Sequence, residues 1–229
     1  MECGYTSRRR GRLVRRTQFR FQGRTPWCAR SCSGRTRLWP AVGCWSLVSG
    51  AVAPFDSDAD LNQDRGFRLL ANTPVTLFWR RSVLDETTQW LIAHGYQVTF
   101  LDASSWNTED DLHREVAEAL NFPGYYGRNL DALNDCMRDV VNHDYGWGAE
   151  STGLALVFAG YDAFSRNCPR AAQVVLDIMA DQSRSAALFG RRLMCLVQTN
   201  DPRIGFDPVG AVPVSWNDAE WLDASRRSG

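Results

Sequence analysis

Apolar and polar residues follow two different periods along this 229-residue chain. At residues 96–101 they alternate, which is the pattern of a half-buried strand. Residues 154–158 and 193–197 are continuously apolar, as expected for strands buried on both faces of a parallel sheet. Residues 75–79 are β-branched and aromatic, and they predict a further strand.

Between these strands, apolar residues recur every three or four positions and predict helices. One helix ends at Gly95, one is capped by Thr108, one is capped by Asn129, and a long one begins at Pro169. Because strands alternate with helices, we predict an α/β fold with a small parallel sheet covered by helices.

The same patterns predict a division of the chain. Residues 1–53 show neither period and are rich in arginine and cysteine, so we expect them to be disordered. Residues 54–66 are polar and acidic and predict a linker. Residues 67–204 hold the predicted α/β domain, including a first strand and helix at 75–95, and residues 205–229 form a C-terminal extension.

The formal net charge of zero conceals two oppositely charged regions. Residues 1–53 carry eleven arginines and one acid, a balance of +10, whereas the rest of the chain carries fifteen arginines and twenty-five acids, a balance of −10. The predicted domain is therefore acidic, and we expect its partner to be basic. We also expect no direct binding of nucleic acid by the folded domain.

Several interpretations of residues 1–53 remain open: a nucleic-acid arm, a targeting segment, or a segment without function. A secretory leader would use the apolar residues 38–48, but Pro40 and Gly43 interrupt them. A transit peptide would also be rich in arginine, yet four cysteines and three tryptophans are unusual in one. The sharp change of composition at residue 53 favours a disordered segment, with an over-extended reading frame as its origin.

Residues 122–136 predict a loop followed by an acidic helix. A proline and two glycines exclude regular structure in the loop, and Asn129 is a favourable N-cap. Asp131, Asp135 and Asp139 then share one helical face, where repulsion between neighbours costs roughly 0.2 to 0.5 kcal/mol per pair. Such a face is either simply solvated or binds a partner, and two adjacent tyrosines in the loop favour binding.

From residue 123 to 136 the sequence reads Pro-x-Tyr-Tyr-Gly-x-Asn-Leu-Asp-Ala-Leu-x-Asp-Cys. This pattern resembles the signature of the barstar family of intracellular ribonuclease inhibitors, and a weaker similarity extends over residues 96–198. The resemblance implies a barstar-like fold, in which three parallel strands, here the three that follow Gly95, are packed with helices. The strand at 75–79 is expected to add a fourth, N-terminal strand.

The resemblance also implies roles for individual residues. Tyr125 is expected to enter the active-site cleft of a basic ribonuclease. Asp135 is expected to mimic an RNA phosphate there, and Asp131 to make a second charged contact. Gly127 and Asn129 are expected to shape and support the loop.

Three positions depart from the family prototype. Arg128 stands where the prototype has an acid, Asn134 where it has a tryptophan, and Asp139 where it has a glycine. We include Asn134 among the predicted partner-binding residues, and these departures leave open a different nuclease as the target. Asp177 is a candidate for a later acidic contact from the last long helix.

Evidence for catalysis is weak. The three histidines have neither metal nor triad spacing, and Cys136 is interpreted as a small buried residue rather than a nucleophile. A hydrolase that uses Asp131 and Asp135 as paired carboxylates remains an alternative. A non-inhibitory interaction or regulatory domain on the same fold is another.

We therefore predict a bacterial, cytoplasmic, antitoxin-like or immunity protein that blocks a basic ribonuclease or nuclease toxin. It is expected to have no catalytic residues, cofactor or metal ion. No apolar run approaches the roughly 18 residues of a membrane span, so we expect no membrane partner.

Overall fold

The computed structural model describes residues 64–228, with only the backbone of the last two. The expectations for residues 1–53, and for most of the predicted linker, lie outside the described residues. Asp64, near the end of that linker, accepts a hydrogen bond from the N–H of Gly66 at 3.0 Å and caps helix α2 (Arg65–Asn72). The described region therefore begins with a capped helix.

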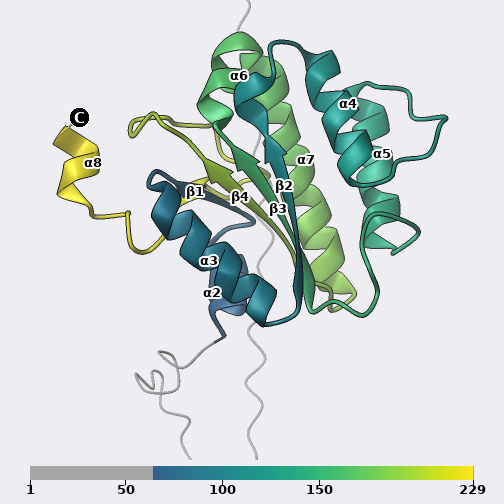
Figure 1. Ribbon diagram of the computed structural model, residues 1–229, viewed down its shortest axis with the longest axis horizontal. Coiled ribbons are helices and arrows are strands. Elements are labelled where there is room, and N and C mark those ends of the chain that lie inside the picture. Colours follow the sequence, from purple (N-terminus) through teal and green to yellow (C-terminus); the bar gives the residue numbers. More distant parts are fainter. Residues whose placement is uncertain (1–63, 229) are drawn as a thin grey trace, which may run out of the picture. The chain divides into compact units, whose positions relative to one another are not determined.

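Five strands of the described region form one parallel sheet (Figure 1). They are β1 (Val75–Phe78), β2 (Tyr96–Asp102), β3 (Gly153–Ala159), β4 (Leu193–Gln198) and β5 (Ser215–Trp216). Their order across the sheet is β2-β3-β4-β1-β5. The predicted N-terminal strand is β1, which pairs with β4 from Val75 opposite Cys195 to Phe78 opposite Gln198. The predicted α/β class is confirmed.

Helices cover both faces of the sheet (Figure 1). Helices α2 and α3 (Arg81–Ala93) pack on one face. The other face carries α4 (Glu109–Ala119), α5 (Leu130–Val141), α6 (Tyr161–Asn167) and α7 (Pro169–Leu188). A short 3-10 helix, η1 (Ala103–Ser105), follows β2, and α8 (Ala224–Ser228) ends the described region.

The sequence of β3 explains how one strand serves both faces. All seven of its residues are buried. Leu156 and Phe158 pack with α4 to α7, whereas Ala155 and Val157 pack with α2 and α3. A continuous apolar run is therefore required here, because neither face of this strand contacts water.

Strand β5 is a difference from the sequence prediction of four strands, and it lies within the predicted C-terminal extension. Its two residues pair with Thr76 and Leu77 of β1. Glu220, which is fully buried, then accepts hydrogen bonds from the backbone N–H groups of Trp79 and Arg80 at 2.9 and 2.7 Å. These contacts fix residues 215–220 against the end of β1.

Candidate protein-binding site

The loop between α4 and α5 presents Tyr125 to solvent. The N–H of Tyr126 donates to the carbonyl of Pro123 at 2.9 Å, so residues 123–126 form a tight turn with Tyr125 near its tip. The side chain of Tyr125 is 79% exposed. The loop therefore displays one large aromatic residue.

Tyr126 anchors this turn to the domain. Its hydroxyl lies 2.5 Å from Nδ1 of His113, a buried residue of α4. Its ring packs edge to face on Phe122, which packs the same way on Tyr145, with centroid distances of 4.9 and 5.8 Å. Burial lowers the pKa of His113 and raises the pKa of Tyr126. Both groups are therefore neutral near pH 7, and their hydrogen bond holds the turn in place.

Helix α5 begins directly after the turn. Asn129 is its N-cap, since its Oδ1 accepts a hydrogen bond from the N–H of Ala132 at 2.8 Å. The preceding Arg128 has a φ of 47°, in the left-handed region that costs a non-glycine residue about 1 to 2 kcal/mol. The side chain of Arg128 is exposed and has no ion-pair partner among residues 64–228. Its charge is therefore available to a partner.

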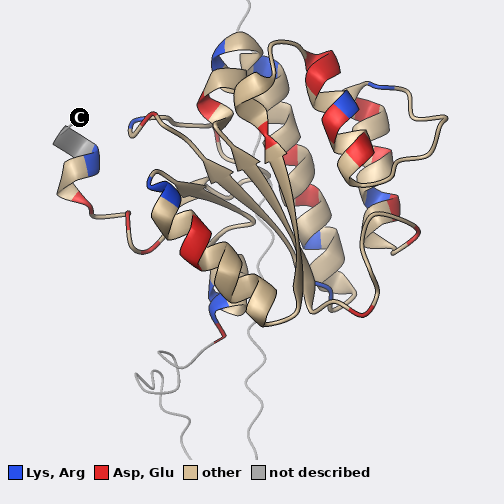
Figure 2. Cartoon of the chain, in the orientation of Figure 1, with Lys and Arg blue, Asp and Glu red and all other residues tan. Residues whose placement is uncertain are grey.

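The outer face of α5 carries the three predicted aspartates, each in a different environment. Figure 2 shows acidic residues along both α4 and α5. Asp131 is exposed in the first turn, where the helix dipole favours an anion. Asp135 is exposed and forms an ion pair with Arg138 at 3.0 Å, a base that the sequence pattern did not place on this face. Asp139 is half-buried and accepts a hydrogen bond from the Tyr145 hydroxyl at 3.2 Å.

Asn134 connects α5 to α7. Its backbone carbonyl and its Oδ1 accept hydrogen bonds from Nε2 of Gln182, at 3.4 and 2.8 Å. Beside Asn134 lies a shallow groove of about 260 Å³ between the two helices, bordered by the carboxylates of Asp131, Asp177 and Asp181. The structure thus brings the candidate Asp177 into the same groove as Asp131.

The predicted partner-binding residues divide into exposed groups and supporting groups. Tyr125, Asp131 and Asp135 are exposed. Asn129 caps α5, and a Cβ at Gly127 would lie 3.3 Å from the Asn129 side chain, so these two residues shape the loop. Their part in binding a partner stays a prediction.

Sequence reasoning missed the supports of this site. The side chain of His113 is buried, because Tyr126 from the loop covers it, and the sequence pattern did not indicate this contact. Trp147 belongs to the core, and Tyr145 packs against it. The bond between Asn134 and Gln182 joins residues 48 positions apart, and nothing in the local sequence indicates it.

Reactive groups near the site are buried or engaged. Cys136 is 4% exposed, which confirms its interpretation as a small buried residue. In the part of the chain that the structure describes, no group of three or more His, Cys, Asp or Glu side chains is placed to hold a metal ion. No helix described here has the length and apolar character needed to cross a membrane.

Comparison with known proteins places the site within a family match. Residues 96–198, somewhat under half of the chain, match the family model described as Barstar (barnase inhibitor). The matched segment runs from β2 to β4 and includes the Tyr125 turn, α5 and α7. It leaves out α2, β1, α3 and the C-terminal segment.

A relative from Bacillus subtilis (strain 168), named "Putative ribonuclease inhibitor YrdF", is 46% identical over 42 residues. These residues are 18% of this chain and 46% of the relative, so the match spans less than half of the relative's own length. The parallel sheet packed with helices agrees with the family match. Residues 96–198 are therefore similar to the barstar family of ribonuclease inhibitors.

Proposed function

We propose that this protein binds a basic ribonuclease or nuclease toxin and blocks its active-site cleft. The exposed Tyr125, held on an anchored turn beside the acidic face of α5, is the observation that carries the proposal. Tyr125 would supply a rigid aromatic contact at the centre of the interface. Asp131 and Asp135 would meet arginine and lysine side chains that otherwise bind RNA phosphates.

The charge of the domain supports the same partner. Residues 54–229 carry a net charge of −10, which would accelerate association with a basic enzyme in a salt-dependent way. Close charge pairs across such an interface contribute about 1.5 to 7 kcal/mol. That range was measured in the barnase–barstar complex, an example from this same family.

Inhibition assays with the purified full-length chain test the proposal. Barnase and a panel of other basic ribonucleases would be titrated with wild-type protein and with the Tyr125→Ala and Asp135→Ala variants. Asp85→Ala is the matched control, because Asp85 also pairs with an arginine on a helix surface, at 3.1 Å, but on the other face of the sheet. We expect the Tyr125→Ala and Asp135→Ala variants to inhibit the ribonuclease at least tenfold more weakly than the wild-type protein, and the control variant to inhibit it as strongly.

Two results would count against this assignment. Equal inhibition by Asp135→Ala and Asp85→Ala would place the interface away from α5. If none of the ribonucleases is bound, the inhibitor function itself is wrong for this chain.

The proposal includes a bacterial cytoplasm as the location and an immunity or antitoxin-like role. The described cysteines, Cys136, Cys168 and Cys195, are all free thiols, as is usual in a reducing compartment. A hydrolase that uses Asp131 and Asp135 gains no support from the geometry. Both carboxylates lie exposed on a helix surface, and Asp135 is paired with Arg138.

A further inference from the structure

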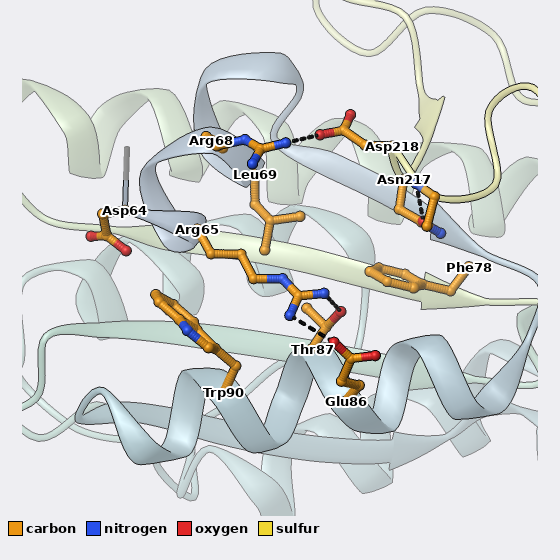
Figure 3. A pocket seen from close by; sticks show the side chains of 11 residues that line it. Asp64, Arg65, Arg68, Leu69, Phe78, Glu86, Thr87, Trp90, Asn217 and Asp218 are labelled. Atoms are coloured by element: carbon orange, nitrogen blue, oxygen red, sulfur yellow. Dashed lines mark hydrogen bonds and ion pairs between the residues drawn. The ribbon is translucent and has the colours of Figure 1, made fainter. Parts of the chain in front are cut away.

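A larger cavity lies on the α2 and α3 side of the sheet, opposite the side that carries α5. It has a volume of about 720 Å³ and lies between α2, α3 and residues 217–219 (Figure 3). Cavities that bind small ligands typically measure about 300 to 1,000 Å³. Every residue that lines this cavity lies outside residues 96–198, so the cavity is separate from the segment that matches the inhibitor family.

The walls of the cavity are fixed by contacts within the protein. Asp64 forms an ion pair with Arg192, which anchors the start of α2. On the opposite side, the buried Glu220 carboxylate accepts a hydrogen bond from the Asn217 side chain. The ring of His94 stacks on Trp90 with centroids 3.7 Å apart and fixes the indole at the edge of the cavity. The cavity is therefore preformed.

Two arginines of α2, Arg65 and Arg68, reach into the cavity one helical turn apart (Figure 3). Arg65 donates to Glu86 at 3.3 Å and to Thr87 at 3.2 Å, and Arg68 donates to Asp218 at 2.8 Å. Each guanidinium has five N–H donors, so most of them are unused. The side chains of Glu86 and Asp218 are 73% and 59% exposed, and ion pairs that are this exposed contribute little to stability. An anion can therefore compete for both guanidinium groups.

The remaining lining restricts what accompanies that anion. The Phe78 ring is fully buried, so Leu69 and the half-buried Trp90 provide the apolar surface that a ligand can reach. These side chains can pack against a flat ring. The carboxylates of Asp64, Glu86 and Asp218 would repel a simple anion, but they can accept hydrogen bonds from hydroxyl or amino groups. A fatty acid or a plain aromatic carboxylate carries no such donors.

A phosphate, a flat ring and several hydroxyl donors occur together in a nucleotide. We infer that this cavity binds a nucleoside monophosphate. Arg65 and Arg68 hold the phosphate, the base packs against Trp90, and the ribose hydroxyls donate to Glu86 or Asp218. Because the cavity and Tyr125 lie on opposite sides of the sheet, nucleotide binding and ribonuclease binding are expected to be independent.

Isothermal titration calorimetry of the full-length chain tests this inference, with AMP, GMP, adenosine and inorganic phosphate as separate probes. About 150 mM salt limits binding to the arginines of residues 1–53. We expect one molecule of AMP or GMP to bind at least tenfold more tightly than adenosine or phosphate. The Arg65→Gln/Arg68→Gln double variant is expected to lose at least tenfold in affinity. Arg81→Gln, which changes an exposed arginine outside the cavity, is expected to lose nothing.

A variant that is expected to bind more tightly distinguishes a loss of the site from a loss of the fold. Glu86→Gln removes the acid that competes for Arg65 and keeps a side-chain acceptor, so AMP should bind at least threefold more tightly. Absence of saturable binding up to millimolar AMP would overturn the inference, as would equal affinity for phosphate alone. Unchanged affinity in the double variant would also overturn it by placing the binding elsewhere. Ribonuclease inhibition by the double variant, measured in parallel, reports on the proposed function separately.

Discussion

Acidification provides a sharp test of the buried pair of His113 and Tyr126. The His113 side chain is 1% exposed, and its Nε2 has no hydrogen-bond partner in the described region. Protonation would put an N–H on both ring nitrogens and leave the one at Nε2 buried and unpaired. Burial therefore lowers the pKa of His113, and it outweighs the nearby Glu109 and Asp110, which act to raise that pKa.

The direction of the effect on stability follows from this lowered pKa. The folded protein binds its proton at a lower pH than the unfolded chain does, so the unfolded chain holds more protons between the two pKa values. His113 contributes its full stabilisation above about pH 6.5, and this contribution is lost as the pH falls from there through the folded-state pKa. A difference of one proton changes the free energy of unfolding by at most about 1.4 kcal/mol per pH unit.

Urea denaturation between pH 8 and pH 5.5 measures this contribution. We expect the wild-type protein to lose up to about 1.4 kcal/mol between pH 8 and pH 5.5. The His113→Gln variant is expected to show a flatter profile, because glutamine does not titrate but can still bond Tyr126. His94→Gln, which changes an exposed histidine at the end of α3, is the matched control. Parallel profiles for wild type and His113→Gln would refute the reasoning.

Three other substitutions test local features of the fold by urea denaturation. Asn129→Ala removes the cap of α5 and should lower the free energy of unfolding by about 1 kcal/mol, whereas Asn129→Asp keeps a capping oxygen and should lower it little. Equal losses in the two variants would contradict the capping role. Glu220→Ala leaves two backbone N–H groups without their acceptor, so it should lower the free energy of unfolding by about 3 kcal/mol. The same variant should speed proteolysis of the C-terminal segment. An unchanged digestion rate would argue against the anchoring role of Glu220. Gly160 and Gly190 both have a positive φ, of 64° and 71°, but a Cβ at Gly160 would lie 2.6 Å from a serine Cβ, whereas a Cβ at Gly190 would meet open space. Gly160→Ala should therefore lower the free energy of unfolding more than Gly190→Ala does. Similar losses in the two variants would rule out the steric cause.

The elements that sequence predicted well are those determined by neighbouring residues. The apolar spacing of α5 identified its buried face, and Leu133, Met137 and Val140 are buried. Asn129 caps that helix through a bond that spans three positions. The long apolar runs became the central strands β3 and β4, because only strands buried on both faces require such runs.

The features that sequence did not predict depend on contacts between distant segments. Strand β5 has only two residues, too few to show any alternation, and it exists because β1 offers a free edge. Asn134 was predicted to bind a partner, but its side chain already accepts a hydrogen bond from Gln182 of α7. Such contacts follow from the packing of the whole domain, so local patterns carry no signal for them.

The strand order explains how additional elements coexist with the proposed inhibitory site. Strands β2, β3 and β4 are neighbours in the sheet, and all three lie within the segment that matches the family. Strands β1 and β5, which lie outside that segment, extend the sheet from the β4 side only. That placement pairs the otherwise free edge of β4 and ends the sheet in a strand of two residues, which offers little surface for aggregation. The added helices α2 and α3 pack on the face opposite α5 and α7 (Figure 1). They therefore leave Tyr125 and the groove bordered by Asp131 and Asp177 uncovered.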